Sequence, residues 1–107
     1  MARIDKVSMI VRAPAGTVLS GLLGVKLNAG GSIVPSGSTD ARGVFCYAGT
    51  IAAGSPAHIL IAGEIVELGG TAGVNYYAGP AGTIRTLATD GSLVGFAVEA
   101  DRLVVHM

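Results

Sequence analysis

Tryptophan is absent from this chain of 107 residues, which contains one cysteine, two histidines, three tyrosines and two phenylalanines. A lone cysteine excludes a disulfide framework within the chain. Lysine plus arginine and aspartate plus glutamate number seven each, so the formal net charge is zero. Because nonspecific nucleic-acid binding depends on clustered cations that neutralise phosphates, we expect no direct binding to nucleic acid.

Long apolar runs and helical patterns are missing as well. No uninterrupted apolar stretch approaches the roughly 20 residues that a membrane-spanning helix needs, and the N-terminal residues lack the apolar segment of a secretory signal. We therefore expect synthesis in a cytoplasm and no membrane partner. Apolar residues nowhere recur at helical spacing over a helix-length window free of glycine.

Glycine and aliphatic residues are abundant instead. The chain has 17 glycines, and 50% of its residues are hydrophobic while 13% are charged. Short runs of Val, Ile and Leu between turn-forming residues are typical of strands. The pattern predicts strands at residues 7–11, 17–19, 24–28, 32–34, 44–47, 57–61, 64–68, 75–78, 83–86, 93–99 and 103–106.

The apolar excess also bears on assembly. Mean hydropathy is +0.63, although a small domain exposes most of its surface to water. We therefore expect part of the apolar surface to be covered by other copies of the chain or by another protein, which predicts a homo-oligomer.

Two stretches read as copies of one another. The first is VKLNAGGSIVP at 25–35 followed by ARGVFC at 41–46, and the second is VNYYAGPAGTIRT at 74–86 followed by LVGFAV at 93–98. Glycine-containing turns at 28–31 and 78–82 are expected to close hairpins, as are 62–63 and 101–102. The polar loop at 35–40 is expected to be an exposed flap. The prediction is an all-β fold, a small β-barrel or β-sandwich built from two related hairpin units.

Residues 1–15 stand apart from the repeats. Apolar and charged residues mix there, and Pro14 ends the segment before the repeated body. We interpret residues 1–15 as an extended N-terminal arm and 16–107 as a single β domain, so that removal of residues 1–12 would leave the body folded. Two alternatives stay open: the arm adds as a strand to a neighbouring subunit, or it is the first strand of its own sheet.

Chemistry-bearing residues do not gather in any recognised pattern. His58 and His106 lack metal-ligand spacing, and Cys46 takes the place of Ala97 or Val98 in the second copy, which predicts a small buried residue rather than a nucleophile. No glycine run precedes a helix or ends in the residues of a phosphate-binding loop. We therefore expect a protein that is not an enzyme, with no catalytic residues, no cofactor and no metal.

The order of the short motifs nevertheless carries a likeness. AGTV at 15–18, GVKLN at 24–28, GVF at 43–45, AG at 53–54, GEIV at 63–66 and GFAV at 95–98 together resemble the capsid decoration (cement) proteins of tailed bacteriophages. The likeness covers roughly residues 15–105. The segments YYAGPAGTI at 76–84 and GSLVGFAV at 91–98 also look like modules of phage head-fibre and tail-fibre proteins.

The resemblance implies a structural protein of the virion that binds the outside of the assembled head and stabilises it. It implies a homotrimer whose partner is the major capsid protein, located on the capsid surface after synthesis in the cytoplasm of a bacterial host. The candidate capsid or subunit contacts are chosen from the arm and from the one pair of adjacent tyrosines, of which one is expected in the core and one at the surface. They are Arg3, Ile4, Lys6, Val7, Arg12, Tyr76 and Tyr77.

Two other functions are kept as alternatives. The first is a head-fibre or tail-fibre module that binds a receptor or a glycan through exposed aromatic side chains. The second is a biotinyl- or lipoyl-like carrier domain, which needs a modified lysine at the tip of a hairpin. Lys26 lies within an expected strand, two residues before the nearest turn, which disfavours the carrier.

Overall fold

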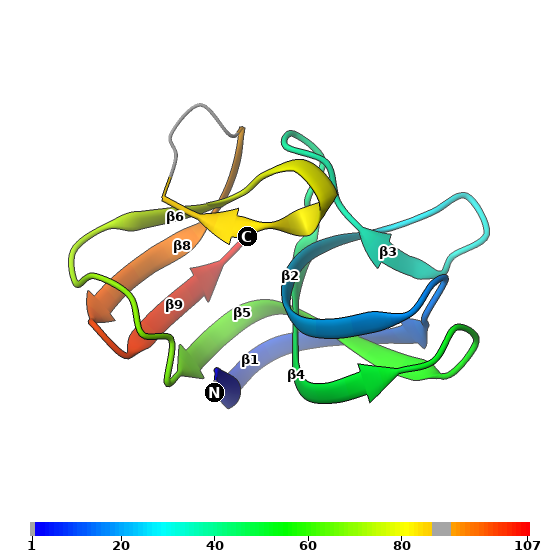
Figure 1. Cartoon of the computed structure of the whole chain (residues 1–107), viewed down its shortest axis with the longest axis horizontal. Coiled ribbons are helices and arrows are strands. Elements are labelled where there is room, and N and C mark those ends of the chain that lie inside the picture. The colour runs from blue at the N-terminus through cyan, green and yellow to red at the C-terminus, as the bar shows by residue number, and fades with distance from the viewer. Residues whose placement is uncertain (1, 87–90) are drawn as a thin grey trace.

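A computed structural model describes residues 2–86 and 91–107, and its regular structure is almost entirely β (Figure 1). The strands are β1 (Arg3–Pro14), β2 (Leu19–Leu27), β3 (Ile33–Pro35), β4 (Gly43–Ile51), β5 (Pro56–Val66), β6 (Asn75–Ala78), β7 (Ile84–Arg85), β8 (Ser92–Glu99) and β9 (Arg102–His106). One 3₁₀ turn, η1 (Pro80–Gly82), connects β6 and β7. The all-β prediction is confirmed.

All strands belong to one curled sheet with the order β3-β2-β4-β5-β9-β8-β6-β7, and β1 pairs with β5 beside this path. The order reads the same from both ends when β2, β3, β4 and β5 are matched with β6, β7, β8 and β9. We call β2–β5 the first unit and β6–β9 the second unit; they lie on opposite sides of Figure 1. The repeat predicted from the sequence therefore corresponds to two units of identical strand order.

The glycines at matching places in the two repeats allow strands to approach closely. A Cβ at Gly43 in β4 would meet the side chain of Ile59 and the carbonyl oxygen of Leu60 in β5. A Cβ at Gly95 in β8 would meet the carbonyl oxygen of Val104 in β9. Each glycine thus holds the third strand of its unit against the fourth, which explains why the motif occurs twice.

The buried apolar residues form two cores, one within the first unit and one that the second unit shares with β4 and β5. The first contains Ala15, Leu19, Val25, Ile33, Phe45, Ala57 and Ile59, and the second contains Val44, Leu60, Ile65, Tyr76, Ala78, Val94, Ala97, Leu103 and Val105. The adjacent residues Ile59 and Leu60 enter different cores. Since neighbouring side chains of a strand point to opposite faces, the two cores lie on opposite faces of the sheet where β4 and β5 meet.

The predicted turns are largely correct. Residues 28–31 close the β2–β3 hairpin, and the Asn28 side-chain oxygen accepts hydrogen bonds from the amides of Gly30 (2.9 Å) and Ser32 (3.0 Å). Residues 78–82 close the β6–β7 hairpin through η1. The last hairpin is confirmed with its turn one residue earlier than expected, between Glu99 and Arg102.

The hairpin predicted at Ala62 and Gly63 is wrong, because residues 56–66 form one continuous strand, β5. A Cβ at Gly63 would meet the carbonyl oxygen of Lys6 in β1, and the Gly63 φ angle of 156° lies where glycine is favoured. The glycine therefore serves a close approach of two strands rather than a reversal of the chain.

The loop at 35–40 is not an exposed flap. Ser36 is 2% exposed, and the Asp40 carboxylate accepts hydrogen bonds from the Lys26 ammonium (2.6 Å) and the Gly37 amide (2.6 Å). The Gly91 amide donates to the carbonyl of Ser38 (2.6 Å), which ties the loop to the second unit. Those hydrogen bonds hold the loop across the junction between the units.

Candidate interaction surface

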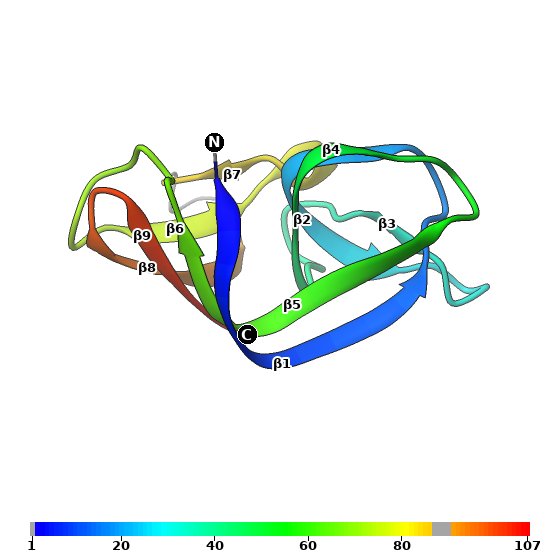
Figure 2. The same ribbon diagram turned by 90° about the horizontal axis from the view of Figure 1, so that it is seen from below.

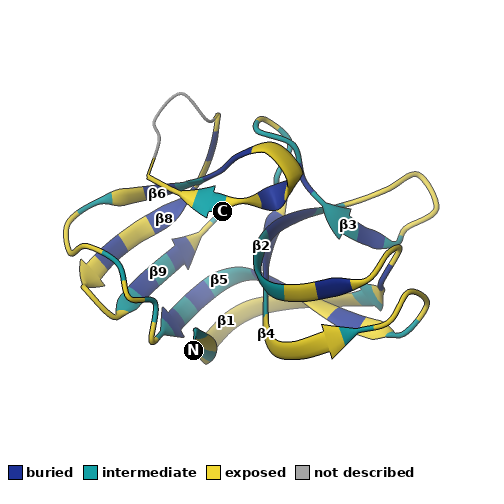
Figure 3. Ribbon diagram, viewed as in Figure 1, coloured by how far each residue is buried: buried dark blue, intermediate teal, exposed yellow. Residues whose placement is uncertain are grey.

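Strand β1 is the most exposed strand of the sheet, and Figure 3 shows the exposed colour along most of its length. The sequence left two alternatives for the arm, and the structure supports the second one. Residues 3–14 form a strand of their own sheet, antiparallel to β5 over its whole length. The side chains of Val7, Met9, Ile10 and Val11 are nonetheless 38–56% exposed. A row of exposed apolar residues on one strand is a feature of protein-binding surfaces.

Charged residues of β1 form ion pairs near its N-terminal end. Arg3 lies 3.7 Å from the Asp5 carboxylate and 3.6 Å from that of Glu67, and Lys6 lies 3.7 Å from Glu64. Exposed pairs of this kind contribute at most about 1 kcal/mol each. They leave the basic side chains at the surface and available to a partner.

Glu64 joins three neighbouring strands. Besides Lys6 of β1, it accepts a hydrogen bond from the Arg102 guanidinium of β9 (3.1 Å), which also binds Glu99 of β8 (2.9 Å). The hydrogen bond to Glu64 and the charge of Glu99 raise the pKa of Arg102. This network links side chains of β1, β5, β9 and β8 on their outer face.

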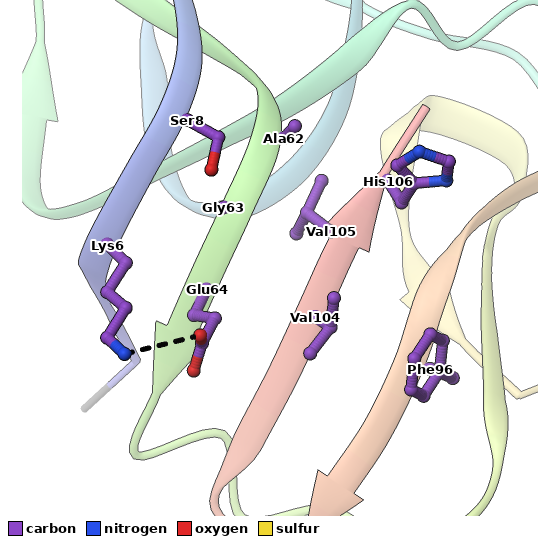
Figure 4. Close-up of a pocket in the computed structure, with 9 residues that line it drawn as sticks. All are labelled: Lys6, Ser8, Ala62, Gly63, Glu64, Phe96, Val104, Val105 and His106. Atoms are coloured by element: carbon purple, nitrogen blue, oxygen red, sulfur yellow. Dashed lines mark ion pairs between the residues drawn. The ribbon is translucent and has the colours of Figure 1, made fainter.

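An open hollow of about 370 Å³ lies on that face (Figure 4). Its floor comes from the middle of β5 and from Val104 and Val105, while Lys6, Glu64 and His106 carry the polar groups around it. The Phe96 ring of β8 stands at one side, as the close-up shows. The hollow thus combines an aromatic ring with polar side chains from three other strands.

Apolar side chains continue from this hollow along β8. Leu93, Phe96 and Val98 are 40–48% exposed, and Val104 of β9 lies opposite Phe96 in the ladder. Together with the hollow they form what we call the outer face of the second unit. The sequence predicted a strand here but did not mark its side chains as a surface.

A second hollow of about 220 Å³ lies between β4 and β5, and Ile4, Phe45, Cys46 and His58 are among its lining residues. Cys46 is half-buried, and this burial raises the pKa of its thiol. A raised pKa reduces the thiolate fraction. The repeat predicted a small buried residue at this position, and Cys46 is half-buried.

The predicted contact residues separate into surface and core. Arg3, Lys6, Val7 and Arg12 are exposed on β1, whereas Ile4 is half-buried and packs against the second core. Tyr76 is only 7% exposed, and its hydroxyl oxygen accepts a hydrogen bond from the Thr71 amide (3.0 Å). Tyr76 is thus the core member of the tyrosine pair, and the half-buried Tyr77 is the one that a partner can reach.

Met9, Ile10, Val11 and Phe96 are surface residues that the sequence reasoning missed. Ile10 and Val11 are consecutive apolar residues, a pattern typical of a strand buried on both faces, so the sequence gives no signal of their exposure. In the described ranges, 2–86 and 91–107, no group of three or more His, Cys, Asp and Glu could hold a metal ion. The same ranges contain no helix that is long and apolar enough to cross a membrane.

The chain was compared with protein families, curated sequences and solved structures, and a solved structure matches its fold. No protein-family model matches the chain, and no curated protein sequence matches it. A solved structure from Mycobacterium phage Patience has a TM-score of 0.85 at 17% sequence identity, covering 98% of this chain and 95% of that one. The chain shares its fold with a phage protein. At this identity the likeness concerns the fold, over nearly the full length of both chains.

Proposed function

We propose that the protein is a structural protein of a phage virion, a capsid decoration (cement) protein that binds the outside of the assembled head and stabilises it. The observation that carries the proposal is the shared fold with the chain from Mycobacterium phage Patience, over 98% of this protein. The resemblance of the ordered glycine motifs to decoration proteins points the same way.

In this proposal the protein works through its surfaces and not as an enzyme. It is made in the cytoplasm of a bacterial host and resides on the capsid surface as a homo-oligomer, for which the resemblance implies a trimer. Its partner is the major capsid protein, and it contacts neither nucleic acid nor a membrane. Many weak contacts repeated over a lattice add through multivalency, so each contact surface can be modest.

We assign the capsid contact to the outer face of the second unit, around Phe96. The apolar side chains there adjoin one another and a hollow with polar groups. Such a mixture is typical of interfaces in which an apolar centre is surrounded by polar groups. The apolar residues of the first unit, such as Leu27 beside the β2–β3 turn, are not continuous with this face.

The test is cosedimentation of the full chain with expanded phage heads assembled without it. Phe96→Asp and Leu27→Asp form a matched pair, because both side chains are 45% exposed. We expect the wild type and Leu27→Asp to sediment with heads, and Phe96→Asp to remain in the supernatant. Failure of the wild type to bind heads would refute the function, and equal binding of both variants would refute the assigned face.

The hollow beside Phe96 favours a second candidate function, a fibre module that binds a glycan. An exposed aromatic ring next to Lys6, Glu64 and His106 offers both a stacking surface and hydrogen-bonding groups. A glycan array probed with the wild type and with Phe96→Ala distinguishes the two. Glycan binding that depends on Phe96, in a protein that ignores heads, would favour the fibre function.

A further inference from the structure

A bulge bends β4 away from β5 in the first unit. The ladder between β2 and β4 shifts register between Ser20 and Gly21, which leaves Ala48 and Gly49 as extra residues of β4. Such a bulge bends the strand that carries it, and Figure 2 shows β4 arching away from β5 before the loop that joins the two strands. In the described ranges the ladder between β4 and β5 holds one residue pair. The second hollow lies where the two strands separate.

Gly49 lets the Tyr47 ring lie at the mouth of this hollow. A Cβ at Gly49 would lie 2.9 Å from Cε2 of the ring, so the ring packs over the β4 backbone in a place that a larger residue would take. Tyr47 is 48% exposed and is one of the lining residues. Tyrosine is enriched at protein interfaces and among the residues that contribute most to binding.

The interior of the second hollow is apolar and small. Its apolar atoms come from Ile4, Phe45, Ile51, Pro56 and Ala57. Sites for drug-sized ligands occupy about 300–1,000 Å³, whereas this hollow has about 220 Å³. The size therefore suits one large apolar side chain, the kind of anchor that fills a pocket at the centre of a protein interface.

A cation and a hydrogen-bond donor lie beside the hollow. Arg12 is opposite His58 in the ladder between β1 and β5, within residues 10–14, where that ladder has no register shift. Residues opposite one another share a face of the sheet, so Arg12 lies on the face where His58 lines the hollow. Both are exposed, and no ion pair in the described part of the chain involves Arg12.

The charge beside the hollow has one sign. Its described lining residues include no Asp or Glu, so the Arg12 guanidinium is not compensated there. A carboxylate is the complement of such a site, because a guanidinium binds a carboxylate through two parallel hydrogen bonds. An imidazole N–H at His58 is a further donor for the same group.

We propose that the second hollow is a docking site for a segment of another protein that presents an apolar side chain next to a carboxylate. The apolar side chain enters the hollow against Phe45 and Ile51, beside the Tyr47 ring. The carboxylate accepts hydrogen bonds from Arg12 and His58. This surface lies on the first unit, apart from the outer face of the second unit, so the inference goes beyond the proposed function and does not depend on capsid binding.

Cys46 makes occupation of the hollow measurable. It is the one cysteine of the chain, and it is half-buried among the lining residues. Iodoacetamide reacts with the thiolate, and the reaction is run at mildly alkaline pH because burial raises the pKa of this thiol. The rate of alkylation then reports whether the hollow is free or covered.

The probe is a short glycine–serine peptide that carries a phenylalanine between two aspartates. At a peptide concentration about ten times the dissociation constant, mass action leaves roughly a tenth of the sites free. Alkylation of Cys46 is therefore expected to slow by about tenfold. A peptide with asparagines in place of the aspartates, and one with alanine in place of the phenylalanine, are expected to protect the thiol less.

Two charge variants of the full chain test the carboxylate contact. Arg12→Glu is expected to raise the dissociation constant of the peptide by about tenfold. Arg42→Glu, the same charge change at an exposed arginine that does not line the hollow, is the control and is expected to leave it unchanged. Each variant is compared with and without peptide, so that a change in the intrinsic reactivity of Cys46 cancels. Circular dichroism checks that each variant is folded.

Four outcomes would overturn the docking site. They are alkylation that the peptide does not slow, equal protection by the aspartate and asparagine peptides, and equal peptide affinity in Arg12→Glu and Arg42→Glu. The fourth is protection by free phenylacetate at a concentration where the peptide gives none, which would make the hollow a site for a small aromatic acid. Alkylation that slows as the protein itself is concentrated would likewise replace the other protein with a second copy of the chain.

The docking site and the proposed function fail separately. Aspartate-dependent protection of Cys46 in a protein that ignores phage heads would refute the proposed function and leave the docking site intact. Binding to heads by a protein whose Cys46 the peptide never protects would do the reverse.

Discussion

Replacing Gly95 with alanine tests the close packing of β8 against β9. Alanine is normally the better residue in a strand, and the exchange would stabilise the fold by about 0.5–1 kcal/mol if nothing stood in the way. Here the new Cβ would meet the carbonyl oxygen of Val104 and lie 2.9 Å from its carbon. The added methyl group can only be accommodated if the two strands separate.

The cost follows from what surrounds β9. Overpacking typically costs about 1–3 kcal/mol, and the upper end applies because the obstructing atoms are backbone in a strand paired on both sides, with β8 and β5. We expect a loss of about 3 kcal/mol in the free energy of unfolding. A domain of this size loses about 4–8 °C in Tm per kcal/mol, so the expected decrease is about 15 °C.

Thermal unfolding followed by circular dichroism measures the effect. Gly95→Val is expected to be at least as damaging. Gly43→Ala is also expected to lower the melting temperature, because its Cβ would meet the Ile59 side chain and lie 2.9 Å from the carbonyl oxygen of Leu60 in β5. Gly30→Ala is the control, since the nearest atom is the Asn28 side-chain oxygen at 3.4 Å. A Gly95→Ala protein that melts at or above the wild-type temperature would refute the reasoning.

Two further predictions concern side chains that hold loops. Tyr76→Phe removes the acceptor of the Thr71 amide and is expected to lower the free energy of unfolding by about 1 kcal/mol. Tyr77→Phe is the control and should change it by less than about 0.5 kcal/mol. Equal effects in denaturant titrations would contradict the assignment of Tyr76 to the core. The hydrogen bond from Lys26, followed by that from the Gly37 amide, lowers the pKa of Asp40 below its ordinary 3.8. The stability from this group is therefore complete above pH 3.8 and disappears as the pH falls through the lowered value. Asp40→Asn should melt below the wild type at neutral pH and together with it in strong acid, and a difference that persists in acid would count against the charged loop contact.

The fold could be predicted from the sequence where local residues decide the conformation. Asn28 and the glycines after it form a turn by their own hydrogen bonds, so the β2–β3 hairpin is visible in the sequence. Gly63 shows where prediction from local sequence fails. Glycine permits both a chain reversal and a close approach of two backbones, and only the contact with Lys6 of a distant strand decides between them.

The candidate surface was predictable only in part for a related reason. Alternation indicated that Tyr76 and Tyr77 point to opposite sides, but which of them is buried depends on the curl of the sheet and on the contact with Thr71. Along β1 the ladder with β5 shifts register at three places, one of them between Val7 and Met9, so the residues that share a face could not be read from spacing. These shifts are a property of the pairing between β1 and β5, so the sequence of β1 alone does not reveal them.

The adjacent residues Ile59 and Leu60 supply different cores from one stretch of backbone. A force applied to either unit is consequently transmitted along β5 to the core of the other unit, because the same stretch of backbone is anchored in both. The halves should melt and yield together, as a single mechanical element.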